Sequence, residues 1–262
     1  MNLVGKICLF ADLNQSNFGG MENHATHFIR FFSERKDYQL VYIVTKNTDG
    51  LNTVVNPFGK CIFTGLKSST LGFFLAQEFE QFHVICFFNN GWWIEDIPAL
   101  RKYLSSAFFC QRTGGNEVLQ AALIDMSLSY KNRIKFWVNT NNTYLDAFIT
   151  NSSFTTKRMS SIGINRNIVF EISGGVDVNA CQSAKKNKSR LRRLYFGEFH
   201  NEICVVSASR FVDFKGLDVA NAAVSIAQKM KSFVFFIVGS GEQEYFLKKT
   251  VEQDKNLRCV FL

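Results

Sequence analysis

The chain has 262 residues, of which 47% are hydrophobic and 20% are charged, so it can form two domains of moderate size or one large one. This composition excludes a disordered protein. The net charge of +8 is uneven: residues 1–150 hold 13 Lys and Arg against 12 Asp and Glu, and residues 151–262 hold 17 against 10. The second half is therefore expected to face an anionic partner such as a phosphate-bearing ligand, a membrane surface or a nucleic acid.

Short apolar runs alternate along the chain with segments whose apolar residues recur at helical spacing. The expected strands are 3–10, 39–45, 61–65, 83–88, 107–111 and 146–150, followed by a second series of 167–172, 203–209, 233–239 and 258–262. The expected helices are 20–34, 93–104, 153–161, 216–230 and 241–253. Many strand runs are apolar throughout, as strands buried on both faces are. The alternation predicts an α/β fold with parallel sheets covered by helices.

The stretch 181–199 is polar and basic, and it separates the two series of elements. We place the domain boundary just before it, at "SGGVD" (173–177), which predicts domains at 1–175 and 176–262. The run "KKNKSRLRR" (185–193) is interpreted as a flexible solvated loop, with contact to an anionic membrane surface as the functional alternative. Because the run lacks interleaved aromatic residues, nucleic acid is not expected as a partner.

The sequence lacks the patterns of a secreted protein, a membrane-spanning protein and a zinc or disulfide protein. The N-terminal apolar run contains Lys6 and has no cleavage-site pattern after it, so no signal peptide is expected. The apolar runs "FVFFIVG" and "HVICFF" are too short to span a bilayer. The seven cysteines are scattered without a C-x-x-C pair, which favours reduced core thiols over zinc or disulfides. We expect a cytoplasmic protein, and a peripheral position on the inner face of the membrane is the alternative.

The stretch "GGMENH" (19–24) follows an expected strand and opens an expected helix. The first N–H groups of a helix are unpaired and carry partial positive charge, and glycine lets a ligand approach the backbone, so this loop is suited to an anion. A plain turn with Gly20 near the helix start is the alternative. The stretch is not a dinucleotide fingerprint, because G-x-G-x-x-G is absent.

A second constellation lies in "SASRFVDFKGLDVA" (207–220), where Arg210 and Lys215 flank a loop and Gly216 opens a helix. Two cations at the carboxyl end of a parallel strand face the edge where such sheets bind ligands, and a diphosphate there would meet both cations and a helix end. Two solvated surface cations are the alternative. Gly239 and Gly241 form a third strand–loop–helix junction, for which simple connector geometry is the alternative.

Taken together and in this order, these segments resemble the family-four glycosyltransferases, which are retaining enzymes of the GT-B fold. Gly19-Gly20-Met21-Glu22 resembles the family's GG-x-E loop, and "DAFITNSSFTTKRM" resembles the end of its first domain. Three further stretches match family motifs. The family's N-G-V-D corresponds to Gly174-Gly175-Val176-Asp177, its R-x4-K-G corresponds to residues 210–216, and its G-x-G corresponds to residues 239–241.

The resemblance implies two Rossmann-like domains, with a nucleotide-diphosphate sugar as donor substrate in the cleft, no further cofactor and no metal. It implies a hexosyltransferase acting on a glycan or lipid-linked acceptor in cell-surface polysaccharide or lipopolysaccharide synthesis. Arg210 and Lys215 would be the catalytic cations. The expected donor diphosphate site consists of Gly19, Gly20, Arg210, Lys215, Gly216, Gly239 and Gly241. The expected acceptor-side residues are Glu22, His24, Arg112 and Asn116.

The sequence also departs from the family pattern. Gly174 stands in place of Asn, Ser209 stands in place of Gly, and the family's paired glutamates do not occur before the chain ends at Leu262. We therefore expect a C-terminally truncated family member whose second domain is incomplete and whose activity is impaired. Two alternatives stay open: a non-catalytic chain that needs a partner, and a sugar-nucleotide epimerase of the GT-B fold.

Overall fold

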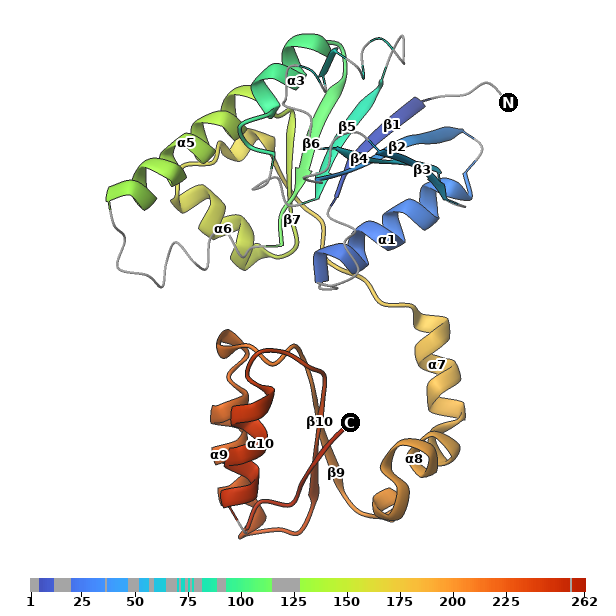
Figure 1. Ribbon diagram of the computed structural model, residues 1–262, viewed down its shortest axis with the longest axis vertical. Coiled ribbons are helices and arrows are strands. Elements are labelled where there is room, and N and C mark those ends of the chain that lie inside the picture. The colour runs from blue at the N-terminus through green and yellow to red at the C-terminus, as the bar shows by residue number, and fades with distance from the viewer. Residues whose placement is uncertain are drawn as a thin grey trace. The chain divides into compact units, whose positions relative to one another are not determined.

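The chain divides into two compact units, Met1–Gly175 and Val176–Leu262 (Figure 1). The computed structural model describes residues 5–11, 20–35, 37–46, 52–56, 59–64, 70, 72–73, 75, 77, 82–88, 93–114, 128–254 and 256–262. Both units alternate strands with helices around a parallel sheet, which confirms the predicted α/β fold.

The first unit contains an eight-stranded sheet in the order β3-β4-β2-β1-β5-β6-β7-β8. Every neighbouring pair from β4 to β8 is parallel, whereas β3 runs antiparallel to β4. Its elements are β1 (Gly5–Phe10), α1 (Gly20–Ser33), β2 (Tyr38–Lys46), β3 (Asn52–Asn56), β4 (Gly59–Thr64), β5 (Val84–Phe88), α3 (Ile97–Tyr103), β6 (Phe108–Arg112), α5 (Leu128–Tyr144), β7 (Ala147–Thr150), α6 (Ser153–Ser161), η3 (Arg166–Ile168) and β8 (Val169–Glu171).

The sheet of the first unit separates two hydrophobic cores, because alternate side chains of each strand point to opposite faces. In β1, Ile7 and Leu9 pack with α1, whereas Cys8 and Phe10 pack on the face covered by α3, α5 and α6. Figure 1 shows α1 on one side of this sheet and α3, α5 and α6 on the other. The near-continuous apolar strands of the sequence are therefore explained by burial on both faces.

Three features of the first unit differ from the sequence prediction. The strand β3 and the helix α5 were not predicted, and β8 joins the sheet of the first unit although its run was assigned to the second series. Helix α5 is rich in Asn and Thr, which have low helix propensity, and it has little amphipathic pattern. Burial of Trp137 and Val138 against the sheet stabilises it instead.

The second unit contains a three-stranded parallel sheet in the order β11-β10-β9. Helices α9 and α10 cover one face through a core of Phe211, Leu217, Phe235, Ile237 and Leu247. Its elements are α7 (Val178–Lys186), α8 (Lys188–Phe196), η4 (Gly197–Asn201), β9 (Cys204–Ala208), η5 (Asp213–Lys215), α9 (Leu217–Gln228), β10 (Val234–Val238), α10 (Glu244–Gln253) and β11 (Cys259–Phe261).

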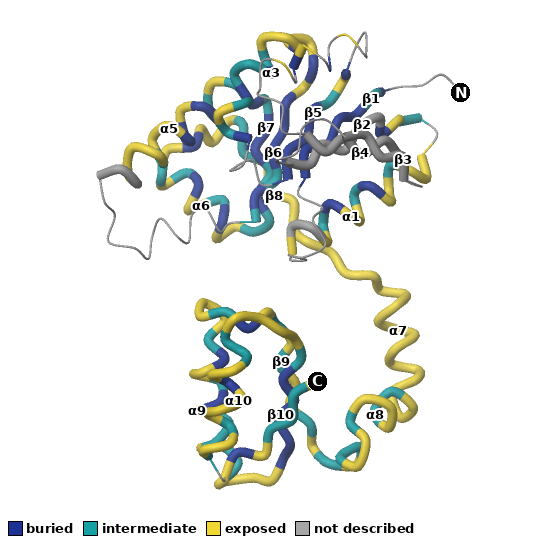
Figure 2. Tube along the Cα trace, viewed as in Figure 1, coloured by how far each residue is buried: buried dark blue, intermediate teal, exposed yellow. Residues whose placement is uncertain are grey.

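The central strand β10 is buried on both faces, as its apolar sequence predicts (Figure 2). Phe236 points away from α9 and α10, and its ring centroid lies 4.4 Å from that of Phe196 in α8. The same expectation is wrong for β9, where Val205 is 40% exposed and Val206 is 50% exposed. The reason is that β9 is an edge strand and pairs only with β10.

The basic run 185–193 is helical, so its interpretation as a flexible loop is wrong. Lys185 and Lys186 end α7, and the rest of the run after Asn187 belongs to α8. Helix α7 begins where the carboxylate of Asp177 accepts a hydrogen bond from the backbone N–H of Ala180 at 2.9 Å, which is an N-cap. The last residue of "SGGVD" is thus a helix-capping residue. Within the described residues, no helix is long and apolar enough to cross a bilayer.

Arg192 holds α8 against the segment that leads into β9. Its Nε donates to the carbonyl oxygen of His200 at 2.7 Å, and its Nη2 donates to the carbonyl oxygen of Glu202 at 2.5 Å. The guanidinium carbon lies 5.4 Å from the ring centroid of Phe196, within the range of a cation–π contact. The Arg192 side chain therefore joins α8 to the segment before β9 and satisfies two backbone carbonyls of that segment.

We predict that Arg192→Ala lowers the free energy of unfolding of the second unit by about 2–3 kcal/mol, because charged hydrogen bonds to two carbonyls are lost. Chemical denaturation measures this change. The control Arg190→Ala removes an exposed arginine from the same helix and should change stability by less than about 0.5 kcal/mol. Equal effects of the two substitutions would contradict the assigned role of Arg192.

Candidate functional site

The second unit joins two loops at the carboxyl ends of β9 and β10. The backbone N–H of Ser209 donates to the carbonyl oxygen of Val238 at 3.0 Å, and that of Phe211 donates to Ser240 at 2.8 Å. The N–H of Gln243 then donates back to the carbonyl oxygen of Phe211 at 3.0 Å. The loop after each strand is therefore held by the loop after the other.

Gly239 and Gly241 are required by this close approach of the two loops. A Cβ on Gly239 would lie 2.0 Å from the carbonyl oxygen of Ser209, and a Cβ on Gly241 would lie 2.6 Å from that of Phe211. Both glycines also have positive φ angles, of 142° and 152°, which other residues rarely adopt. The geometry therefore shows that both glycines allow the loop after β10 to pack against the loop after β9.

Arg210 lies between Ser209 and Phe211, whose backbone N–H groups bond to the end of β10 and the loop after it. The ring of Phe211 is buried in the core of the unit, whereas Arg210 is exposed. Lys215 ends η5 and is also exposed, with its Nζ 5.4 Å from the ring centroid of Phe214. Across the described part of the chain, neither Arg210 nor Lys215 forms an ion pair, so both charges are available to a ligand.

Helix α9 begins directly after these cations. Gly216 precedes it in the left-handed conformation, with φ of 63° and ψ of 33°, and no side chain caps the helix. The unpaired N–H groups of its first turn carry partial positive charge. Lys215 and the start of α9 are adjacent in the chain, and Arg210 lies in the loop that leads from β9 to them. Positive charges and unpaired helix N–H groups are the groups that bind anions in proteins.

No sequence pattern indicated that two polar side chains near these loops are buried. Ser209 Oγ and the side-chain amide of Asn221 are buried without a hydrogen-bond partner in the described residues. Asn221 faces inward from α9 and is 1% exposed. The only sequence signal was a polar residue on the apolar face of the helix. A small cavity of about 90 Å³ lies nearby, and its lining includes Asp213 and Asp218, which would repel a phosphate.

In the first unit, three predicted or matched residues meet at the carboxyl edge of the sheet. His24 lies in α1, and its Cε1 is 3.7 Å from the place that a Cβ on Gly174 would take. Arg112 ends β6, and its Nη1 donates to the carbonyl oxygen of Ile172 at 3.3 Å. His24, Arg112 and the segment after β8 therefore form one cluster.

Burial and positive charge determine the protonation of this cluster. Burial, together with the nearby charges of Arg112 and His27, holds the pKa of His24 below its ordinary value of 6.5. Burial also lowers the pKa of the Arg112 guanidinium. The neutral imidazole is thus favoured, and a neutral histidine can accept a proton or a hydrogen bond from a substrate hydroxyl.

The other predicted residues of the first unit are less informative. Gly20 is exposed at the start of α1, and a Cβ there would have no neighbour within 4 Å. Glu22 belongs to α1, but its side chain lies outside the described residues, as do Gly19 and Asn116 entirely. Gln111, to which no sequence pattern pointed, is fully buried in β6, and both of its side-chain polar atoms lack a partner among the residues described.

No group of three or more His, Cys, Asp or Glu side chains in the described ranges is arranged to hold a metal ion. Among the described cysteines, Cys8, Cys86, Cys110, Cys181, Cys204 and Cys259 are free thiols. Burial raises the pKa of the Cys8 thiol far above its ordinary value and that of Cys259 to about 11. These two cysteines are therefore unreactive core residues.

We predict that Gly239→Ala lowers the free energy of unfolding by roughly 2–3 kcal/mol, because the added Cβ collides with the Ser209 carbonyl and the φ angle is strained. The control is Ser240→Ala in the same loop, which leaves the backbone unchanged. Thermal and urea unfolding of both variants measure the difference. If Gly239→Ala were as stable as Ser240→Ala, the two loops would not be packed as described.

We predict that Arg112→Ala raises the pKa of His24, because it removes a neighbouring positive charge. In the unsubstituted chain the folded pKa is the lower one, so the contribution of His24 to stability is complete above about pH 6.5 and is lost as the pH falls below it. An NMR titration of the imidazole measures the pKa, with Arg133→Ala on α5 as the control. An unchanged pKa of His24 in Arg112→Ala would show that the charge of Arg112 does not act on the His24 imidazole.

A scan of protein-family models finds none that matches the chain, and a search of curated proteins finds none with significant similarity. Solved structures do match. The Anabaena protein HepE in complex with UDP superposes with a TM-score of 0.71 at 16% identity, over 98% of this chain and 68% of that chain.

Two further structures extend the comparison. The lipopolysaccharide outer core galactosyltransferase WaaB matches with a TM-score of 0.56 at 13% identity, over 98% of this chain and 67% of that chain. The UDP-N-acetylglucosamine 2-epimerase from Rickettsia bellii matches with a TM-score of 0.50 at 10% identity, over 99% of this chain and 68% of that chain. At these identities the similarity establishes the architecture: the chain has the GT-B fold, with two Rossmann-like domains.

Proposed function

We propose that the protein is a glycosyltransferase that moves a sugar from a nucleotide diphosphate to a hydroxyl acceptor. The observation that carries the proposal is the strand-end site of the second unit, where Arg210, Lys215 and the uncapped start of α9 offer positive charge without an ion-pair partner among the described residues. A diphosphate is the anion that such a set suits, because it presents several acceptor oxygens. HepE, which has the same fold, was solved with UDP and with UDP-glucose.

The proposed chemistry depends on charge. When the bond between the sugar and the diphosphate breaks, negative charge develops on the leaving diphosphate. Arg210 and Lys215 would stabilise that charge, and the first N–H groups of α9 would add donors that are already oriented. Gly239 and Gly241 would contribute by letting the loop backbone lie close to the phosphates. Gly19 and Gly20 remain proposed diphosphate contacts of the first unit.

The first unit is proposed to bind the acceptor. His24 and Arg112 form the described part of this set, and Glu22 and Asn116 remain proposed members. A neutral His24 suits contact with an acceptor hydroxyl, and Arg112 suits an acceptor that carries an anionic group. We further propose hexosyl transfer with retention of configuration onto a cell-surface glycan or a lipid-linked acceptor. The fold shared with WaaB, a lipopolysaccharide galactosyltransferase, supports this class.

Two other functions have an observation in their favour. An epimerase acting on a nucleotide sugar is supported by the similarity to the Rickettsia bellii enzyme. A non-catalytic chain that requires a partner is supported by the exposed valines of the edge strand β9, since such an edge is a template for another chain. Incubation with a panel of nucleotide sugars, with and without acceptors, distinguishes the three by a glycosylated product, an isomerised sugar nucleotide, or neither.

We predict that Arg210→Ala and Lys215→Ala each weaken UDP binding, because each removes a charged hydrogen bond worth roughly 1.5–3 kcal/mol. Isothermal titration calorimetry measures the affinity. Lys186→Ala is the matched control, because it removes one exposed cation of the same unit at the end of α7. Three equal and negligible effects would remove the basis for assigning a diphosphate to this strand end.

A further inference from the structure

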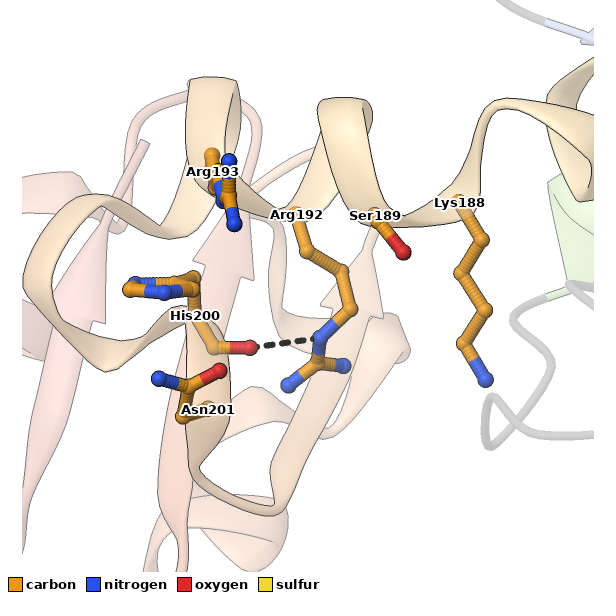
Figure 3. A pocket seen from close by; sticks show the side chains of 6 residues that line it. All are labelled: Lys188, Ser189, Arg192, Arg193, His200 and Asn201. Carbon is orange, nitrogen blue, oxygen red and sulfur yellow. Dashed lines mark hydrogen bonds between the residues drawn. The ribbon is translucent and has the colours of Figure 1, made fainter.

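A second basic site lies in the second unit, away from the loops at the ends of β9 and β10. A cavity of about 360 Å³ opens between the first turns of α8 and the 3₁₀ helix η4 (Figure 3). No carboxylate lines it. The lining residues are Lys188, Ser189, Arg192, Arg193, His200 and Asn201.

The walls of this cavity are fixed by hydrogen bonds. Arg192 joins α8 to η4 through the carbonyl oxygen of His200, the bond drawn in Figure 3, and through that of Glu202. The Nδ1 of His200 lies 2.9 Å from the carbonyl oxygen of Gly197, which fixes the ring on the opposite wall. These contacts are internal to the unit, so the backbone on both sides of the cavity and the side chains of Arg192 and His200 are held before a ligand binds.

Two further positive charges, those of Lys188 and Arg193, line the cavity. Lys188 and Arg193 form no ion pair with any residue that the structure describes. Two glutamates stand in or next to η4 in the sequence, Glu198 and Glu202. Glu198 of η4 does not line the cavity, and the carboxylate of Glu202 is paired with Arg258 at 2.9 Å. The first turn of α8, which holds Lys188, also has no side-chain cap.

We propose that this cavity binds a phosphate group. An ammonium, a guanidinium fork, a hydroxyl and an amide around one preformed cavity match a tetrahedral dianion with several acceptor oxygens. A nucleic-acid strand fits less well, because no Phe, Tyr or Trp side chain is among the described residues that line the cavity. The phosphate belongs to a small soluble molecule or to a lipid headgroup. The exposed side chains of Leu194 and Tyr195 on the same helix make a lipid surface a source worth testing.

The test compares two double variants that remove the same charge. Lys188→Ala/Arg193→Ala removes the unpaired cations of the cavity, and Lys186→Ala/Arg190→Ala removes two exposed cations of α7 and α8 that do not line it. Both are made in the full chain carrying Arg210→Ala and Lys215→Ala, so that a diphosphate site at the strand end cannot contribute. If the alanine variant does not fold, Lys188→Gln/Arg193→Gln replaces it.

The probes are inorganic pyrophosphate in solution and vesicles with or without an anionic phospholipid. We expect pyrophosphate to shift the backbone amide signals of His200 and Asn201 in a saturable way. We expect Lys188→Ala/Arg193→Ala to weaken this binding roughly tenfold or more and Lys186→Ala/Arg190→Ala to change it less than twofold. A loss of vesicle binding confined to the first variant supports the site with a lipid as the source. No saturable binding of either probe, or equal loss in the two double variants, overturns the proposal.

Discussion

The structure of the second unit depends on the pairing of two loops by backbone hydrogen bonds around Phe211. The ring of Phe211 is buried against α9, β10 and α10, while its N–H and carbonyl groups both bond to the loop after β10. This arrangement fixes the backbone on either side of Arg210 and leaves its side chain in solvent. The exposed cation is therefore presented by a rigid segment, which lowers the entropy that a bound anion has to remove. The glycines of the second loop are the condition for this packing.

On the opposite face of the same sheet, a buried aromatic ring and hydrogen bonds to backbone groups again hold the structure together. Phe236 of β10 contacts Phe196 of α8, and Arg192 joins that helix to the segment entering β9. One arginine of the basic run is thus a structural residue, whereas its neighbours Lys188 and Arg193 form no ion pair with the described residues. Within the described residues of 151–262, one cation, Arg192, is used to bond backbone carbonyls. We propose that others bind anions, at two separate places in the unit.

Much of the fold could be predicted from the sequence because most strands are short apolar runs, and burial on both faces produces such runs directly. The prediction failed where composition and tertiary context disagree. Helix α5 is poor in helix formers and is stabilised by burying Trp137, which no local pattern reveals. The basic run 185–193 was interpreted as a loop because it is polar and charged, but its helices pack partly through a charged residue, Arg192. The exposed valines of β9 could not be predicted, because strand order decides which strand is at the edge.

Only part of the candidate site could be proposed from the sequence. Arg210, Gly239 and Gly241 closely follow the carboxyl ends of β9 and β10, and Lys215 ends η5 in the loop after β9, so the topology of parallel sheets predicts that they lie at one edge. Gln111, Ser209 and Asn221 were missed, since a polar residue in an apolar run carries no signal of whether it finds a partner. The contact between His24 and the segment after β8 was also beyond reach, because it joins residues far apart in the sequence.

Binding of a nucleoside diphosphate by the strand-end loops of the second unit can be tested by an NMR titration of the isotope-labelled chain with UDP, in which backbone amide signals report binding residue by residue. We expect the largest shifts at Arg210, Lys215, Gly216, Gly239 and Gly241, with the amides of β11 and the exposed face of α10 unaffected. Saturable binding whose shifts lie elsewhere in the chain, or no binding at millimolar UDP, would contradict it.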